Sequence, residues 1–94
     1  MVEINQVEGE DRGDVMLYAI STCVWCKKTK RLLKKLGVAY KYVDVDQLSS
    51  EERDQVEEEV RKWNPRCSFP TLVFNQKTCV VGFKEYEIKT ELEK

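Results

Sequence analysis

The chain of 94 residues contains no histidine. This absence removes the usual general base, every Cys–His nucleophilic pair and every metal site that requires an imidazole. Long apolar runs are missing too, since none approaches the roughly 18 to 20 residues that a membrane-spanning helix needs. The first residues, MVEINQVEGEDRGD, are acidic and have no apolar secretory core. We therefore expect a cytoplasmic protein that has no membrane partner.

An excess of charge of either sign is also absent. The 16 basic and 17 acidic side chains leave a formal net charge of −1. Near-neutrality gives no electrostatic indication of binding to nucleic acid or to an anionic membrane. The apolar fraction of 41% and the charged fraction of 35% are ordinary for a globular domain of this length. We find no repeat or low-complexity segment and expect a monomer.

Two regions differ in their patterning. Residues 1–13 are polar and lack periodicity, which predicts a flexible N-terminal tail or, at most, a frayed first strand. Residues 14–94 carry the signals of one folded domain. Short apolar runs predict strands over residues 14–20, 38–46, 71–75 and 78–82. Helical spacing and capping signals predict helices over residues 25–36, 48–64 and 83–94.

The order of these elements is β-α-β-α-β-β-α. Alternating strands and helices predict parallel strands joined by right-handed crossovers, and the closing hairpin adds an antiparallel strand. The expected fold class is therefore α/β, with a central mixed four-stranded sheet and three helices. Gly37 is a natural stop for the first helix, and Ser49 with Glu52 fits a capping box at the start of the second.

A Cys-x-x-Cys pair, Cys23 and Cys26, follows the first predicted strand directly and begins the first helix. The free N–H groups and the positive dipole end of a helix N-terminus favour a thiolate there. A thiolate is the nucleophile of disulfide exchange. Cys26 lies about one helical turn further on, so the spacing fits attack by Cys23 and resolution by Cys26. In a cytoplasmic chain such a pair is typically catalytic or metal-binding rather than structural.

Two other interpretations of the cysteines stay open. The pair could consist of ordinary buried residues. Alternatively, Cys67 and Cys79 could complete a zinc or iron–sulfur site, although they do not form a second Cys-x-x-Cys motif. We favour redox exchange and expect no metal ligands and no bound cofactor. Cys67 is more simply a small, partly buried residue than a third reactive thiol, and Cys79 is expected in the core.

The strand before CVWC, the helix after it and the later SFP segment resemble the glutaredoxin branch of the thioredoxin fold, from about residue 14 to the C-terminus. The resemblance implies a thioredoxin-like fold and a redox-active disulfide between Cys23 and Cys26. It also implies that Pro70 is a cis-proline facing the catalytic pair. The backbone of Phe69 would then be exposed for strand-like pairing with an extended substrate.

Details of the motif point to one branch of this family. Val24 and Trp25 stand where glutathione-using members usually have proline and tyrosine, and no lysine lies near Ile20. The CVxC motif followed by TKR, and the turn VVGFKEYE, are similar to NrdH-type redoxins, which take electrons from a reductase. Two features depart from that pattern: residues 47–66 form a longer segment, and Glu85 stands where proline is frequent.

The resemblance implies a thiol–disulfide oxidoreductase that reduces protein disulfides, ribonucleotide reductase being one possible substrate. No flavin or nicotinamide fingerprint is present, so electrons must come from a partner, expected to resemble thioredoxin reductase. A glutathione-dependent glutaredoxin is the alternative. The predicted catalytic residues are Cys23 and Cys26. The predicted substrate-binding residues are Thr22, Trp25, Phe69, Pro70, Gly82 and Phe83.

Overall fold

A mixed five-stranded β-sheet lies at the centre of the computed structural model, which describes residues 4–93. The strand order is β1-β3-β2-β4-β5. Strands β2 and β3 are parallel, and every other neighbouring pair is antiparallel. The parallel pair is joined through a helix, as a crossover connection requires. The strands are β1 (Asn5–Val7), β2 (Val15–Ala19), β3 (Tyr40–Asp44), β4 (Thr71–Phe74) and β5 (Thr78–Val81).

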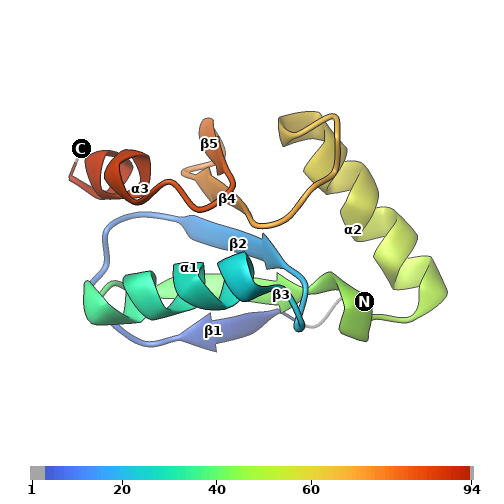
Figure 1. The fold of residues 1–94 in the computed structure, drawn as a ribbon, viewed down its shortest axis with the longest axis horizontal. Coiled ribbons are helices and arrows are strands. Elements are labelled where there is room, and N and C mark those ends of the chain that lie inside the picture. The colour runs from blue at the N-terminus through green and yellow to red at the C-terminus, as the bar shows by residue number, and fades with distance from the viewer. Residues whose placement is uncertain (1–3, 94) are drawn as a thin grey trace.

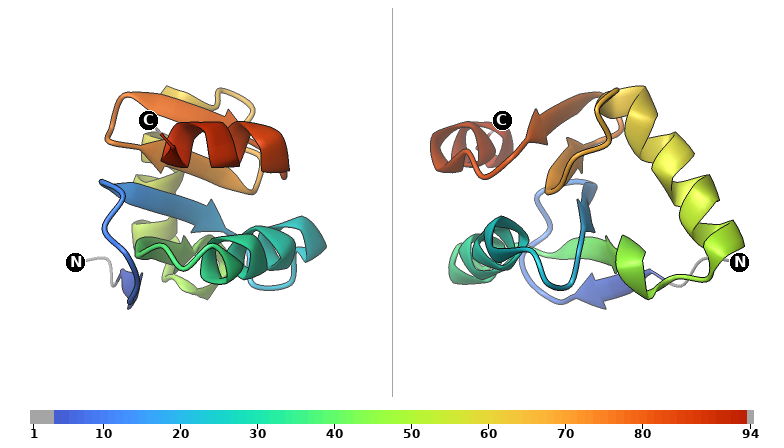
Figure 2. Two further views of the ribbon diagram at one scale, coloured as in Figure 1. Left: turned by 90° about the vertical axis from the view of Figure 1, so that its left-hand side faces the viewer. Right: turned by 45° about the vertical axis from the view of Figure 1, so that its right-hand side comes forward.

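Helices cover both faces of the sheet (Figure 1). The right-hand view of Figure 2 shows α1 (Val24–Lys35) and α3 (Glu85–Leu92) on one face and α2 (Ser50–Trp63) on the other. A short 3₁₀ turn, η1 (Val45–Gln47), leads from β3 toward α2. The larger core lies under α1 and α3 and includes Leu17, Leu33, Leu72 and Ile88. A smaller one lies under α2 and includes Val43, Val45, Val56 and Val60.

The structure confirms the α/β, thioredoxin-like fold and corrects the predicted strand count from four to five. For residues 1–13 the sequence allowed a flexible tail or a frayed first strand, and strand β1 agrees with the second alternative; residues 1–3 lie outside the described part. Strand β1 pairs antiparallel with β3 and satisfies backbone groups on its outer edge. Because β1 is a mostly exposed edge strand, its residues show no apolar alternation.

The loop after β1 is held against the chain that enters β3. The amide of Glu10 donates to the carbonyl of Gly37 at 2.7 Å, and the amide of Ala39 donates to the carbonyl of Glu10 at 2.8 Å. The approach at Gly9 is so close that a Cβ there would lie 2.5 Å from the carbonyl carbon of Val38. This contact requires glycine, which the composition alone could not indicate.

Two predicted helix-end signals agree with the structure. Ser49 caps α2 by accepting from the amide of Glu52 at 3.3 Å, and its hydroxyl donates to the Glu52 carboxylate at 3.1 Å. Gly37 follows α1 with a φ of +72°, a left-handed conformation that glycine adopts without strain. In the part of the chain that the structure describes, none of the helices has the length and apolar character needed to cross a bilayer.

Candidate active site

Cys23 is the N-cap of α1. Its backbone amide donates to the carbonyl of Ile20 at 3.1 Å, which closes the turn between β2 and the helix. Its Sγ accepts a hydrogen bond from the backbone N–H of Cys26 at 3.3 Å. The sulfur thus takes the place of a capping oxygen and lies where free N–H groups favour negative charge. The side chain is half-buried, so a substrate can still reach it.

Cys26 has the opposite surroundings. Its side chain is 0% exposed and belongs to the core under α1. Burial, together with a hydrogen bond to the Cys23 side chain, raises the pKa of the Cys26 thiol to about 12. A backbone hydrogen bond from Ile20 and the charge of Lys30 act in the other direction. The two cysteines therefore differ in access. Cys23 can be reached from solvent, whereas Cys26 is a buried, protonated thiol. All four cysteines of the chain are free thiols in this structure.

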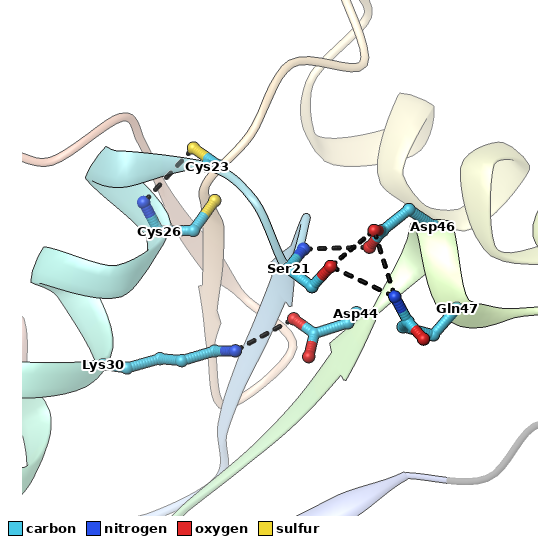
Figure 3. A network of polar contacts seen from close by, with 7 residues as sticks. All are labelled: Ser21, Cys23, Cys26, Lys30, Asp44, Asp46 and Gln47. Atoms are coloured by element: carbon cyan, nitrogen blue, oxygen red, sulfur yellow. Dashed lines mark hydrogen bonds and ion pairs between the residues drawn. The ribbon is translucent and has the colours of Figure 1, made fainter.

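Asp46, in η1, holds the turn that precedes Cys23 (Figure 3). Its carboxylate accepts from the Ser21 backbone N–H at 2.8 Å and from the Ser21 hydroxyl. Gln47 Nε2 donates to the Ser21 hydroxyl oxygen at 3.1 Å. The Ser21 hydroxyl and then its N–H lower the pKa of Asp46 below the ordinary value. Sequence patterns missed this contact because Asp46 falls at the end of a predicted strand, 25 positions away from Ser21.

A second polar contact ties α1 to the sheet below the cysteine pair. Lys30 Nζ lies 2.9 Å from Asp44 Oδ1 at the end of β3 and 4.3 Å from the centre of the Tyr42 ring. Lys30 follows Cys26 by four positions, so both lie on the same side of the helix. Its charge lies close enough to oppose the rise in the Cys26 pKa.

The loop before β4 forms the wall opposite Cys23. The Phe69–Pro70 peptide bond is cis, as the resemblance implied for Pro70. The carbonyl oxygen of Phe69 lies 4.0 Å from Cys23 Sγ. The amide of Gly82 donates to the Pro70 carbonyl at 2.8 Å, with a φ of +86° that favours glycine. The pairing of β2 with β4 therefore brings the distant CVWC and SFP segments together.

Asn64, directly after α2, shapes this loop from inside. The residue is 4% exposed, and its Nδ2 donates to Ser68 O at 3.1 Å, Ser68 Oγ at 2.9 Å and Thr71 Oγ1 at 3.2 Å. Its Oδ1 accepts from the Arg66 amide at 3.2 Å. Sequence reasoning missed Asn64, since the Asn-Pro step there was interpreted only as the end of a helix. The available signal was a polar amide directly after an apolar helical stripe.

Trp25 and Phe83 form what we call the aromatic ledge beside Cys23. Their ring centroids lie 6.1 Å apart with the planes inclined by 25°, an offset stack. Trp25 is 53% exposed, and the neighbouring Val24 is 62% exposed. Lys28 Nζ lies 4.6 Å from the centre of the Trp25 ring. The ledge therefore presents apolar and cationic surface next to the half-buried sulfur.

The remaining predicted residues take simpler positions. Thr22 is exposed in the turn before Cys23. Cys67 Sγ lies 3.8 Å from Glu57 O, and Cys79 Sγ lies 3.4 Å from Trp63 O. Both cysteines are half-buried, which agrees with the prediction for Cys67 and contradicts the core position predicted for Cys79. Within residues 4–93, no three of the Cys, Asp and Glu side chains gather in a group suited to a metal ion.

The combination of a mixed sheet, a Cys-x-x-Cys pair capping α1 and a cis-proline beside it defines a thiol redox protein with the thioredoxin fold. Comparison with known proteins identifies the family. The glutaredoxin family model matches residues 15–80, so the chain belongs to the glutaredoxin family.

Individual relatives agree with this assignment. The glutaredoxin of Methanosarcina mazei Go1 is 54% identical, superposes with a TM-score of 0.89, and the match covers 95% of this chain and 86% of that one. Methanoredoxin of Methanosarcina acetivorans is 50% identical with a TM-score of 0.87, over 89% and 88% of the two chains. An uncharacterised glutaredoxin-like 8.6 kDa protein from a rubredoxin operon of Clostridium pasteurianum is 31% identical over 80 residues, which cover 85% of this chain and 99% of that protein.

Proposed function

We propose that this chain reduces disulfide bonds in proteins by dithiol exchange, with Cys23 as the nucleophile and Cys26 as the resolving thiol. The observation that supports this most directly is the contrast within the pair. Cys23 Sγ is accessible and receives the Cys26 amide hydrogen bond, whereas Cys26 is fully buried behind it. The accessible sulfur meets the substrate, and the buried one is protected until a mixed disulfide forms.

In the first step the Cys23 thiolate attacks one sulfur of the substrate disulfide. A Cys23–substrate S–S bond forms, the substrate S–S bond breaks, and the leaving thiolate takes up a proton. The Phe69 carbonyl, directly before the buried cis-Pro70, lies 4.0 Å from the sulfur, and an extended peptide could pair with the backbone there. The aromatic ledge lies beside the same sulfur and supplies apolar contact area for the substrate.

In the second step Cys26 loses its proton and attacks the Cys23 sulfur. A Cys23–Cys26 S–S bond forms, the Cys23–substrate S–S bond breaks, and the leaving substrate thiolate takes up a proton. Two of the causes that raise the pKa of Cys26 are its hydrogen bond with the Cys23 side chain and the Cys23 charge. Both are lost when Cys23 is in the mixed disulfide. Burial then remains as the opposing cause, and the thiol of Cys26 becomes easier to deprotonate at the moment when it must attack.

Two electrons have now passed to the substrate, and an external donor must return the pair to its dithiol form. We propose a protein reductase resembling thioredoxin reductase as that donor, because Val24, Trp25 and the Gly82–Phe83 turn are similar to the NrdH-type pattern. Ribonucleotide reductase is one substrate that this pattern implies. Glutathione as the electron donor is the rival hypothesis.

The test combines two assays on four proteins. Insulin reduction under dithiothreitol measures reduction of protein disulfides, and a glutathione-coupled assay with hydroxyethyl disulfide measures glutathione use. Wild type, Cys23→Ser, Cys26→Ser and, as a matched control, Cys79→Ser are compared. We expect insulin reduction by wild type and Cys79→Ser, and its loss in both active-site variants. Glutathione turnover that survives Cys26→Ser would refute the proposed electron source, and insulin reduction by Cys23→Ser would refute the proposed nucleophile.

A further inference from the structure

The exposed side of α1 carries a continuous line of positive charge. Five basic residues on this helix are exposed, and the helix contains no acidic residue at all. At about 100° per residue they fall within roughly 120° of the helix circumference, so they share one face. We call this face the basic stripe. It consists of Lys27, Lys28, Arg31, Lys34 and Lys35.

No carboxylate in the described part of the chain pairs with any of the five side chains of the stripe. The carboxylate of Glu85 feels the charge of Lys35 only weakly, since its ion-pair partner is Lys89 at 2.9 Å. Lys30, the sixth cation of the helix, is paired with Asp44 and points to the sheet instead.

Unpaired positive charge distinguishes α1 from α2. The net charge of the chain is −1, and α2, on the opposite face of the sheet, carries acidic residues along its length. Arg53 and Arg61 of α2 both pair with Glu57, and Lys62 pairs with Glu59. Positive charge on α2 is therefore compensated locally, whereas on α1 it faces solvent.

The stripe begins at the catalytic turn. Lys27 and Lys28 directly follow Cys26, and Lys28 lies over the Trp25 ring of the aromatic ledge. From Lys27 to Lys35 the stripe runs about 12 Å along the helix, at 1.5 Å per residue. A protein that presents its disulfide to Cys23 would thus meet the ledge first and the stripe next to it.

We propose that the basic stripe of α1 docks an acidic surface next to the disulfide of the protein that exchanges electrons with Cys23. This inference rests on the proposed function and names the chemistry of its protein partner. Nucleic acid also binds cations, but it carries no disulfide for the adjoining sulfur. Unpaired surface charges act chiefly on the rate of encounter, so the expected effect is on association and is sensitive to salt.

The test uses two synthetic peptides, each closed by one disulfide and identical except for three glutamates or three lysines beside it. Reduced protein, freed of dithiothreitol, is mixed with excess peptide, quenched with acid and analysed by chromatography. Second-order rate constants are measured at about 10 mM and about 1 M salt, where the Debye lengths are about 30 and 3 Å. Neutral hydroxyethyl disulfide serves as the third substrate.

Two variants remove the same charge from different helices. The stripe variant is Arg31→Gln/Lys34→Gln/Lys35→Gln, and the control is Arg53→Gln/Arg61→Gln/Lys62→Gln on α2. Glutamine keeps a helix propensity close to that of arginine and lysine, and circular dichroism checks that both variants are folded. None of the six residues contacts Cys23 or the aromatic ledge through any hydrogen bond or ring contact found among residues 4–93.

We expect wild type to reduce the acidic peptide about tenfold faster than the basic one at low salt, and less than about twofold faster at high salt. The stripe variant should lose this preference and the α2 variant should keep it. Equal loss in both variants would mean that net charge alone matters, which overturns the stripe. Equal rates of wild type with the acidic and the basic peptide would also overturn the proposal. Salt-sensitive self-association of the protein through the stripe would overturn it too. Failure to reduce any of the three disulfides would refute the proposed function itself.

Discussion

The burial of Cys26 has a measurable consequence for its reactivity. Its pKa of about 12 compares with an ordinary value of 9.0. At pH 8 a rise of three units lowers the thiolate fraction about a thousandfold, and the thiolate is the reactive form. A more basic thiolate is a better nucleophile, and with a Brønsted coefficient of 0.4–0.5 it regains about 16- to 32-fold. Cys26 in the native dithiol should therefore react about 30- to 60-fold more slowly than in the unfolded chain. Because the buried side chain is also less accessible to the reagent, the rate should fall further.

The assay is alkylation of the reduced protein by iodoacetamide at pH 8, quenched with acid and analysed by tandem mass spectrometry. Cleavage by trypsin leaves Cys23 and Cys26 in one peptide, residues 13–27, so fragmentation must assign each site. The same Cys26 in urea-unfolded protein is the matched reference. Initial rates are used, because modification of Cys23 removes a hydrogen-bond partner of Cys26.

A native Cys26 that reacts within a few-fold of its unfolded rate would refute the argument from burial. Preferential labelling of Cys26 over Cys23 would refute the assignment of roles as well, since the nucleophile must be the accessible thiol. Cys67 and Cys79, which are half-buried in other parts of the structure, provide internal standards in the same digest.

Three further predictions follow from the polar contacts around the site. Because the folded pKa of Cys26 exceeds the unfolded value, the contribution of Cys26 to stability should be constant below pH 9 and fall as pH rises toward 12, by at most about 1.4 kcal/mol per pH unit. Half-buried Tyr18 and buried Tyr40 act in the same direction. The free energy of unfolding, measured by urea denaturation at each pH, should therefore fall less steeply with rising pH in Cys26→Ala, and an equally steep fall would contradict this. Ser21→Ala removes the hydroxyl but keeps the backbone N–H, so it should move the pKa of Asp46 part of the way up toward its ordinary value in an NMR titration; an unchanged pKa would exclude the hydroxyl as a cause. Asn64→Ala should lower the free energy of unfolding by about 2–3 kcal/mol, because it leaves buried polar groups unpaired; a loss below about 1 kcal/mol in urea denaturation would show that the loop satisfies them otherwise.

Local signals predicted most of the helices correctly. The capping box of Ser49 and Glu52 and the stop at Gly37 are short-range features, and both agree with the structure. The first strand was predicted only as the alternative to a flexible tail, because its signal is not local. Residues Asn5–Val7 are mostly exposed and owe their strand conformation to backbone pairing with β3, which leaves no trace in the side-chain pattern.

The candidate site divides in the same way. The Cys-x-x-Cys spacing and its place before a helix are local, and the cis bond before Pro70 came from the family resemblance. The roles of Asp46 and Asn64 were not predicted. Each residue acts through hydrogen bonds to a loop, and the pattern of apolar residues predicts helices and strands but not loop contacts. The overall charge of −1 gave no indication of the basic stripe, because the acidic residues elsewhere balance it.

By itself the sequence determined the order of the helices and most strands, the thiol chemistry of the CVWC motif and the apolar faces that form the core, because these depend on residue type and on spacings of two to four residues. Tertiary structure alone decided which cysteine is accessible. The core under α1 buries Cys26, while the N-cap position leaves Cys23 half-exposed beside Phe69. The tertiary structure also left the basic stripe of α1 without carboxylate partners in the described part of the chain. Both results depend on packing between segments far apart in the sequence, and burial and unpaired charge exist only once those segments have come together.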